Sequence, residues 1–271
     1  MPEHSPHSPR HLILTLFGLY ARDARNWLSV RSLIALMADL EVDAAATRSS
    51  VSRLKKRGVL EATRRDGQAG YTLSPPALPA VVEGDARIWS RPRASVADGW
   101  LVVVFSVPEP EREKRHELRS LLTRLGFGTA APGVWVAPGT AYEETLAAVE
   151  RQGLGSYTEF FRGAYLGVGS VDARIGEWWD LTVVADLYDA FLVEHRPLVR
   201  LRGGDAARAY AAYVPLLTAW RRFPYLDPGI PLELLPADWP GVAAGELFET
   251  LDGRLREPAA GHARSRMGEN R

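Results

Sequence analysis

The chain has 271 residues, a formal net charge of zero, 46% hydrophobic residues and 24% charged residues, which is typical of a folded protein with about two or three domains. It contains no cysteine, which excludes disulfides, thiolate metal sites and cysteine nucleophiles. No apolar run approaches the roughly 18 residues of a membrane span, and the polar residues 1–9 lack the apolar stretch of a secretory signal. We therefore expect a cytoplasmic protein without a membrane segment.

Residues 11–74 have the pattern of a DNA-binding domain, preceded by residues 1–10, which we expect to be disordered. Spaced leucines predict a first helix over residues 11–22. Ser29 is a suitable N-cap for a second helix, and Asp43 for a third that ends at Gly58. Two strand-like segments follow, around a polar, glycine-rich turn. Helix, turn, helix and hairpin in this order predict a winged helix-turn-helix.

The third helix carries the basic charge that DNA recognition needs. Residues 44–65 contain seven basic side chains and one acidic side chain. Thr47, Val51 and Leu54 share one helix face and are expected to pack inward. The expected base contacts on the outer face are Arg48, Ser49, Ser52 and Arg53. The expected phosphate and wing contacts are Lys55, Lys56, Arg57, Arg64 and Arg65.

Residues 75–98 form a proline-containing linker in which we expect a helix, and residues 99–172 form the predicted middle domain. Strand, helix, strand, helix and strand follow one another there, beginning with a continuous apolar run at residues 100–107. This order predicts a small ferredoxin-like α+β domain.

Residues 173–256 have a helical pattern and form the predicted effector-binding or dimerisation domain. Long helices are expected over residues 175–194, 206–223 and 242–256. The polar residues 257–271 are expected to be a disordered tail. The predicted fold class is thus α+β, with a winged helix-turn-helix, a ferredoxin-like domain and a mainly helical C-terminal domain.

Enzyme motifs are missing from the sequence. There is no nucleophile elbow and no P-loop, and the histidines are isolated, so we predict no enzymatic activity, no cofactor and no metal. A nuclease built on the ferredoxin-like domain is an alternative, although Ser106 to Glu109 occupy the place of the usual aspartate. A winged helix that binds protein is a second alternative.

Three signatures outside the helix-turn-helix carry a family resemblance. The first is WLVVVFSVPE at residues 100–109, followed by an arginine-rich helix. The second is LGFG at residues 125–128 leading to APGVWVAP at residues 131–138. The third is WRRFPYLDP at residues 220–228 with LELLPADWPG at residues 232–241. Together with the helix-turn-helix, they make residues 11–256 resemble the PaaX-type repressors of aromatic-acid catabolism.

The resemblance implies a homodimeric repressor that binds double-stranded operator DNA and releases it on binding an acyl-CoA such as phenylacetyl-CoA. A regulator of another pathway with a different effector is the alternative. Such an effector needs cations for its phosphates and an apolar slot for its acyl group. The effector-binding candidates are Trp135, Tyr157, Phe161, Arg162 and Arg174.

Overall fold

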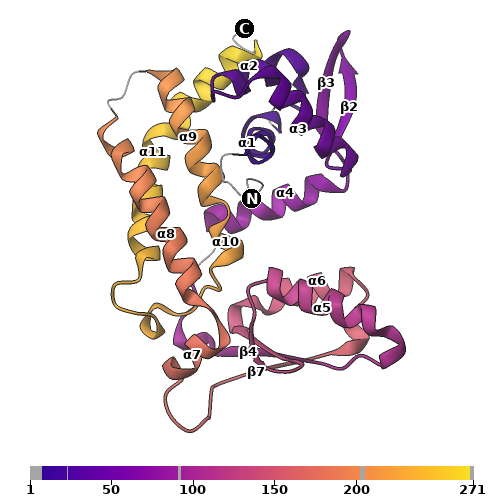
Figure 1. Cartoon of the computed structure of the whole chain (residues 1–271), viewed down its shortest axis with the longest axis vertical. Coiled ribbons are helices and arrows are strands. Elements are labelled where there is room, and N and C mark those ends of the chain that lie inside the picture. Colours follow the sequence, from indigo (N-terminus) through magenta and orange to yellow (C-terminus); the bar gives the residue numbers. More distant parts are fainter. Residues whose placement is uncertain (1–7, 23, 91–92, 202–204, 269–271) are drawn as a thin grey trace. The chain divides into compact units, whose positions relative to one another are not determined.

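The computed structural model describes residues 8–22, 24–90, 93–201 and 205–268, and Figure 1 shows the course of the chain. The chain divides into two compact units. The first consists of Met1–Ser90, Phe191–Arg221 and Ala243–Arg271, and the second of Arg91–Ala190 and Arg222–Val242. The first unit therefore combines the N-terminal domain with much of the predicted C-terminal domain. The sequence predicted consecutive domains and did not predict that N-terminal and C-terminal segments share one unit.

The first unit begins with a winged helix-turn-helix, as the sequence predicted. Its helices are α1 (Pro9–Leu16), α2 (Val30–Ala38) and α3 (Ala44–Lys56), and its strands are β1 (Leu28–Ser29), β2 (Leu60–Arg65) and β3 (Gln68–Leu73). A π-helical turn, Phe17–Ala21, extends α1. The strands form an antiparallel sheet in the order β1-β3-β2. The sequence did not reveal β1, because two residues are too few to show an alternating pattern.

The wing is a tight hairpin of β2 and β3. Its two turn residues, Asp66 and Gly67, have φ angles of 47° and 76°. Such left-handed conformations fit the twist of a two-residue hairpin and favour the pair Asp-Gly. Further along β3, a Cβ atom on Gly70 would lie 2.4 Å from the indole ring of Trp27, so only glycine fits there.

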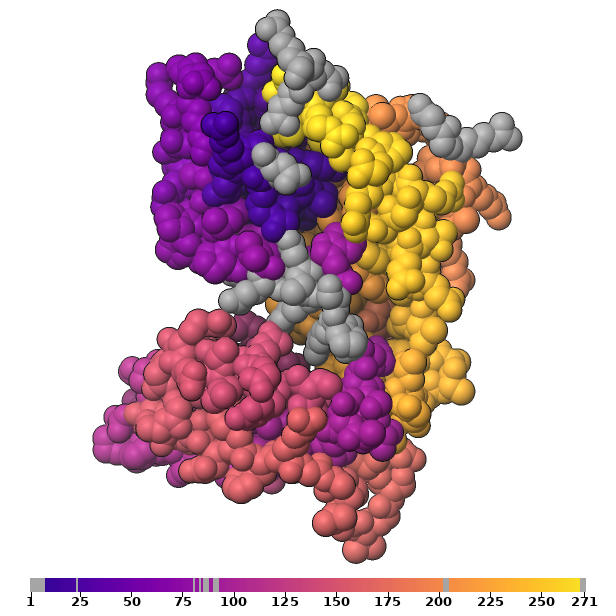
Figure 2. All heavy atoms as spheres, turned by 180° about the vertical axis from the view of Figure 1, so that it is seen from behind, coloured from indigo at the N-terminus to yellow at the C-terminus, as the bar shows by residue number. Residues whose placement is uncertain are grey.

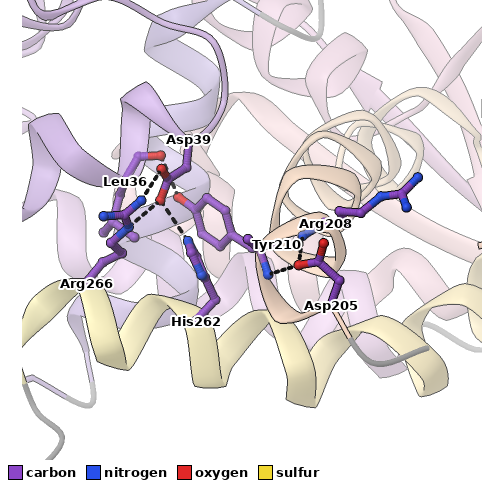
Figure 3. A network of polar contacts seen from close by, with 8 residues as sticks. Leu36, Asp39, Asp205, Arg208, Tyr210, His262 and Arg266 are labelled. Atoms are coloured by element: carbon purple, nitrogen blue, oxygen red, sulfur yellow. Dashed lines mark hydrogen bonds and ion pairs between the residues drawn. The ribbon is translucent and has the colours of Figure 1, made fainter. Parts of the chain in front are cut away.

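The helix-turn-helix is held in the first unit by helices from the C-terminal part of the chain, α9 (Ala206–Trp220) and α11 (Pro240–Met267). Tyr210 of α9 donates a hydrogen bond to the carbonyl of Leu36 at 3.0 Å. Asp39, at the end of α2, accepts hydrogen bonds from His262 and Arg266 of α11, each at 2.7 Å (Figure 3). Burial raises the pKa of Tyr210 above its ordinary value, which keeps its hydroxyl a donor.

The prediction of a disordered tail from residue 257 is therefore wrong as far as Met267, because α11 continues through Pro258. Ala259 and Ala263 are fully buried. In the space-filling view of Figure 2, the yellow C-terminal part of α11 lies beside the indigo N-terminal domain. Residues 269–271 lie outside the described residues. At the other end, the prediction of disorder over residues 1–10 is wrong for the last two, because α1 begins at Pro9, a residue suited to the first helical position. Residues 1–7 lie outside the described residues.

The second unit contains the predicted ferredoxin-like domain. Its strands are β4 (Trp100–Phe105), β5 (Gly128–Ala131), β6 (Val134–Pro138) and β7 (Thr158–Gly163), and its helices are α5 (Arg112–Arg124) and α6 (Tyr142–Arg151). The antiparallel sheet has the order β5-β6-β4-β7, and α5 and α6 cover one face (Figure 1). The sequence did not predict β5, because this mostly exposed edge strand lacks an alternating apolar pattern.

The remaining helices are α4 (Ala77–Ser90), α7 (Asp172–Trp178), α8 (Leu181–His195) and α10 (Phe223–Leu226). One helix was predicted over residues 175–194, but the chain is extended at Trp179, between α7 and α8. Packing explains the break, because the Trp179 indole donates a hydrogen bond to the carbonyl of Gly126 at 2.9 Å. None of the described helices is long and apolar enough to cross a membrane. Short 3-10 turns lie at Val96–Asp98, Glu109–Glu111, Gly139–Ala141, Gly155–Tyr157, Arg196–Arg200 and Leu232–Leu234.

Candidate DNA-binding surface

Side-chain caps begin both helices of the helix-turn-helix, as predicted. The Ser29 hydroxyl accepts a hydrogen bond from the backbone N–H of Ser32 at 2.9 Å, at the start of α2. The Asp43 carboxylate accepts one from the N–H of Ala46 at 2.7 Å, at the start of α3. Each cap satisfies a backbone donor that the first helical turn leaves unpaired. The Ser29 cap therefore marks where α2 begins, and the Asp43 cap marks where α3 begins.

The inner face of α3 is the predicted one. Thr47, Val51 and Leu54 are between 1% and 3% exposed and pack into the first unit. Ser50 is also fully buried, which the sequence did not predict. Its hydroxyl accepts a hydrogen bond from the guanidinium of Arg53 at 3.1 Å. The spacing of three residues was the available signal for this pair, because residues i and i+3 are neighbours on a helix.

The outer face of α3 carries all the predicted base-contacting side chains. Arg48, Ser49, Ser52 and Arg53 are exposed. The expected phosphate contacts Lys55, Lys56 and Arg57 are exposed as well, at the C-terminal end of the helix. Among the described residues, none of these lysines or arginines forms an ion pair. The structure thus leaves their charges available to an anionic partner.

The two wing arginines differ from each other. Arg64 is exposed and, among the described residues, has no hydrogen-bond partner. Arg65 donates to the carbonyl of Arg25 at 2.9 Å, and its guanidinium lies 5.8 Å from the centre of the Trp27 ring. Arg65 therefore joins the wing to the segment before β1, a structural role that the sequence did not predict.

Replacing Arg65 should reduce stability. We expect Arg65→Ala to lower the free energy of unfolding by about 1 kcal/mol, because it removes a hydrogen bond and a cation–π contact. Arg64→Ala, the matched control on the opposite face of β2, should change it by less than about 0.5 kcal/mol. Urea denaturation measures both. Equal stability of the two variants would contradict the structural role of Arg65.

The predicted effector-binding residues do not all come together. Val103 lies opposite Trp135 and Val102 opposite Phe161 in the central sheet, so the two aromatic side chains point to opposite faces. Trp135 is 6% exposed and packs in the core under α5. Phe161 is 59% exposed and, with Arg162, lines a pocket of about 320 Å³ on the other face.

The two remaining effector candidates also have partners within the second unit. Tyr157 donates a hydrogen bond to the Glu111 carboxylate, which raises the pKa of the tyrosine. Arg174 forms an ion pair with Glu177 at 2.7 Å and a hydrogen bond to the hydroxyl of Tyr165 at 3.4 Å. Tyr165 lines the same pocket as Phe161 and Arg162. Of the predicted set, the structure therefore groups Phe161, Arg162 and, through Tyr165, Arg174.

The nuclease alternative concerns the residues just beyond β4 in the central domain. Glu109, just beyond β4, forms an ion pair with Arg115 at 3.3 Å. Within the described part of the chain, no three histidine, aspartate or glutamate side chains are grouped as metal ligands.

Family models match the chain in three consecutive segments. Residues 8–77 match a model described as PaaX-like protein, and residues 93–175 match the PaaX protein central Cas2-like domain. Residues 179–265 match the PaaX-like protein C-terminal domain. The three segments cover the N-terminal domain, the ferredoxin-like domain and the C-terminal helices in the order that the structure shows.

Similar proteins agree with these matches. The transcriptional repressor PaaX of Escherichia coli (strain K12) is 28% identical over 265 residues, which cover 94% of this chain and 82% of that protein. Among solved structures, an uncharacterized protein of Mycobacterium tuberculosis superposes with a TM-score of 0.60. It is 21% identical, and the alignment covers 98% of this chain and 99% of the other. At that identity, the likeness concerns the fold alone.

Proposed function

The chain belongs to the PaaX family, and from this premise we propose that it is a transcriptional repressor that binds operator DNA through α3 and the β2–β3 wing. The observation that carries the proposal is that α3 has one buried face and one exposed basic face. Thr47, Val51 and Leu54 are buried, whereas the arginines and lysines of the opposite face are exposed and form no ion pair among the described residues. An α-helix of this kind fits the width of the major groove.

The side chains of this surface differ in whether they suit DNA bases or DNA phosphates. Arginine recognises guanine through two parallel hydrogen bonds, so Arg48 and Arg53 are the proposed base-reading residues. Ser49 and Ser52 are short hydrogen-bonding partners between them. Lys55, Lys56, Arg57 and Arg64 are proposed to contact phosphates, which fix the position of the helix without reading sequence.

We propose further that the protein is a homodimer in the cytoplasm, that its operator controls an aromatic-acid catabolic pathway, and that an acyl-CoA such as phenylacetyl-CoA releases it from DNA. The resemblance to PaaX-type repressors supports the pathway and the effector. Pockets of ligand size in the second unit are compatible with a small-molecule effector.

A gel-shift experiment with the DNA upstream of the protein's own gene tests the proposal. We expect a retarded complex, its release by phenylacetyl-CoA, and no release by free phenylacetate. Footprinting should reveal two half-sites about 34 Å apart or a multiple of this spacing, because a two-fold dimer presents two copies of α3. Failure to bind any upstream DNA at low salt would refute the repressor assignment and favour a winged helix that binds protein.

Operator binding should depend steeply on salt. Replacing Lys55 and Lys56 by alanine is expected to reduce the slope of log K against log salt by about 4, since the dimer carries two copies of each lysine and each lost phosphate contact removes about one released counterion. The loss of affinity should be the same for operator and scrambled DNA. Arg208→Ala provides the control, because Arg208 is exposed on α9, outside α3 and the wing. An unchanged slope in the double variant would contradict phosphate contact by these lysines.

A further inference from the structure

A groove runs beside α5 on the helix-covered side of the central domain. Its inner part, of about 480 Å³, lies between α5 and the β5–β6 hairpin. The floor is apolar and includes Phe105, Val107 and Trp135, the last only 6% exposed. The inner part adjoins a wider, open part of about 660 Å³ along α5, because Arg115 and Arg119 line both.

The open part of the groove is strongly basic. It is lined by Arg112, Arg115, His116, Arg119, Ser120, Thr123 and Arg124. Arg115 is engaged, since it donates to the Val107 carbonyl at 3.0 Å and forms an ion pair with Glu109. Arg112, Arg119 and Arg124 are exposed and have no ion pair within the described part of the chain.

The nearby carboxylates do not neutralise these arginines. Glu109 is paired with Arg115, and Glu117 is paired with Lys114 at 2.9 Å. Glu111 accepts a hydrogen bond from Tyr157. Glu113 of α5 does not line either part of the groove. The groove therefore presents several uncompensated guanidinium groups next to an apolar recess.

We infer that this groove binds the CoA thioester effector, an inference that rests on the proposed function. The phosphates would lie on Arg112, Arg119 and Arg124, and the aromatic acyl group in the recess over Trp135. Guanidinium groups suit phosphate oxygens because they donate two parallel hydrogen bonds.

The groove fits this ligand better than the pocket on the opposite sheet face does. That pocket has Arg162 as its lining cation, and the Arg162 guanidinium already donates to the carbonyl of Asp98 at 3.1 and 3.2 Å. It offers aromatic walls but no group of free cations for a ligand with three phosphates. The arginines of α5 belong to the arginine-rich helix noted in the sequence, which was not predicted to bind effector.

Calorimetry on the full-length protein tests the assignment, with phenylacetyl-CoA, CoA and phenylacetate as probes. The double variant R112Q/R119Q should bind phenylacetyl-CoA and CoA at least about 10-fold more weakly, because both ligands share the phosphates. Ala131→Trp, at an exposed position that lines the recess, should weaken phenylacetyl-CoA while leaving CoA unchanged. Arg162→Gln, in the opposite pocket, is the matched control and should bind both ligands like the wild type.

The outcomes separate this inference from the proposed function. If the wild type binds phenylacetyl-CoA and R112Q/R119Q binds it equally well, the groove is not the site, while the effector proposal stands. A loss confined to Arg162→Gln would assign the ligand to the opposite pocket and overturn the inference. If R112Q/R119Q loses DNA affinity and keeps its ligand affinity, the basic face contacts DNA and the inference is wrong. If the wild type binds no acyl-CoA, both the inference and the proposed effector fail, whereas operator binding is measured independently.

Discussion

A chain that ends after Arg256 should be about 3–5 kcal/mol less stable than the full-length protein. The deletion removes two fully buried alanines, Ala259 and Ala263, at roughly 1 kcal/mol each. It also removes the hydrogen bonds that His262 and Arg266 donate to Asp39. The Arg266 contribution is small because that side chain is 47% exposed, but the His262–Asp39 pair is largely shielded from water.

Thermal and urea denaturation measure this loss, and a chain that ends at Gly268 is the matched control, with wild-type stability expected. Because Asp39 lies at the end of α2, the shorter chain should also bind operator more weakly than the control does. A truncated protein as stable as the full-length one would show that α11 beyond residue 256 contributes nothing to the first unit.

The double variant R48A/R53A should lose about 2–6 kcal/mol of affinity for each operator half-site, about 30-fold or more, if each arginine reads a base worth about 1–3 kcal/mol. The effect should be much smaller on scrambled DNA, because base contacts contribute little there. Arg48 is exposed and forms no ion pair, so its replacement should change the free energy of unfolding by less than about 0.5 kcal/mol, whereas the loss of the Arg53 hydrogen bond to Ser50 should cost about 1 kcal/mol.

Fluorescence anisotropy at one fixed salt concentration compares operator with scrambled DNA for this variant. Arg208→Ala again serves as the control for loss of a positive charge outside the proposed surface. Equal losses on both DNAs would assign Arg48 and Arg53 to phosphates instead of bases. Ser50→Ala is informative beside them, because the Ser50 hydroxyl accepts a hydrogen bond from Arg53 and restrains its guanidinium.

The sequence by itself determined the features that depend on near neighbours. The caps at Ser29 and Asp43, the buried face of α3 and the exposure of Arg48 and Arg53 follow from helical spacing and local hydrogen bonding. The strand–helix order of the central domain was equally readable, because its buried strands and amphipathic helices have distinct apolar periods. These local signals were sufficient for the fold class and for the candidate DNA-binding face.

Only the tertiary structure decided the features that depend on distant partners. The segment after residue 256 is polar in sequence, yet it is helical, with Ala259 and Ala263 buried and His262 paired with Asp39, 223 residues away. Arg65 resembles Arg64 in sequence but is held by the carbonyl of Arg25, 40 residues away. Trp135 and Phe161 face opposite sides of the sheet because strand pairing, which the sequence does not display, sets their register. Contacts across such separations produce no periodic pattern in the sequence, so only the folded structure shows them.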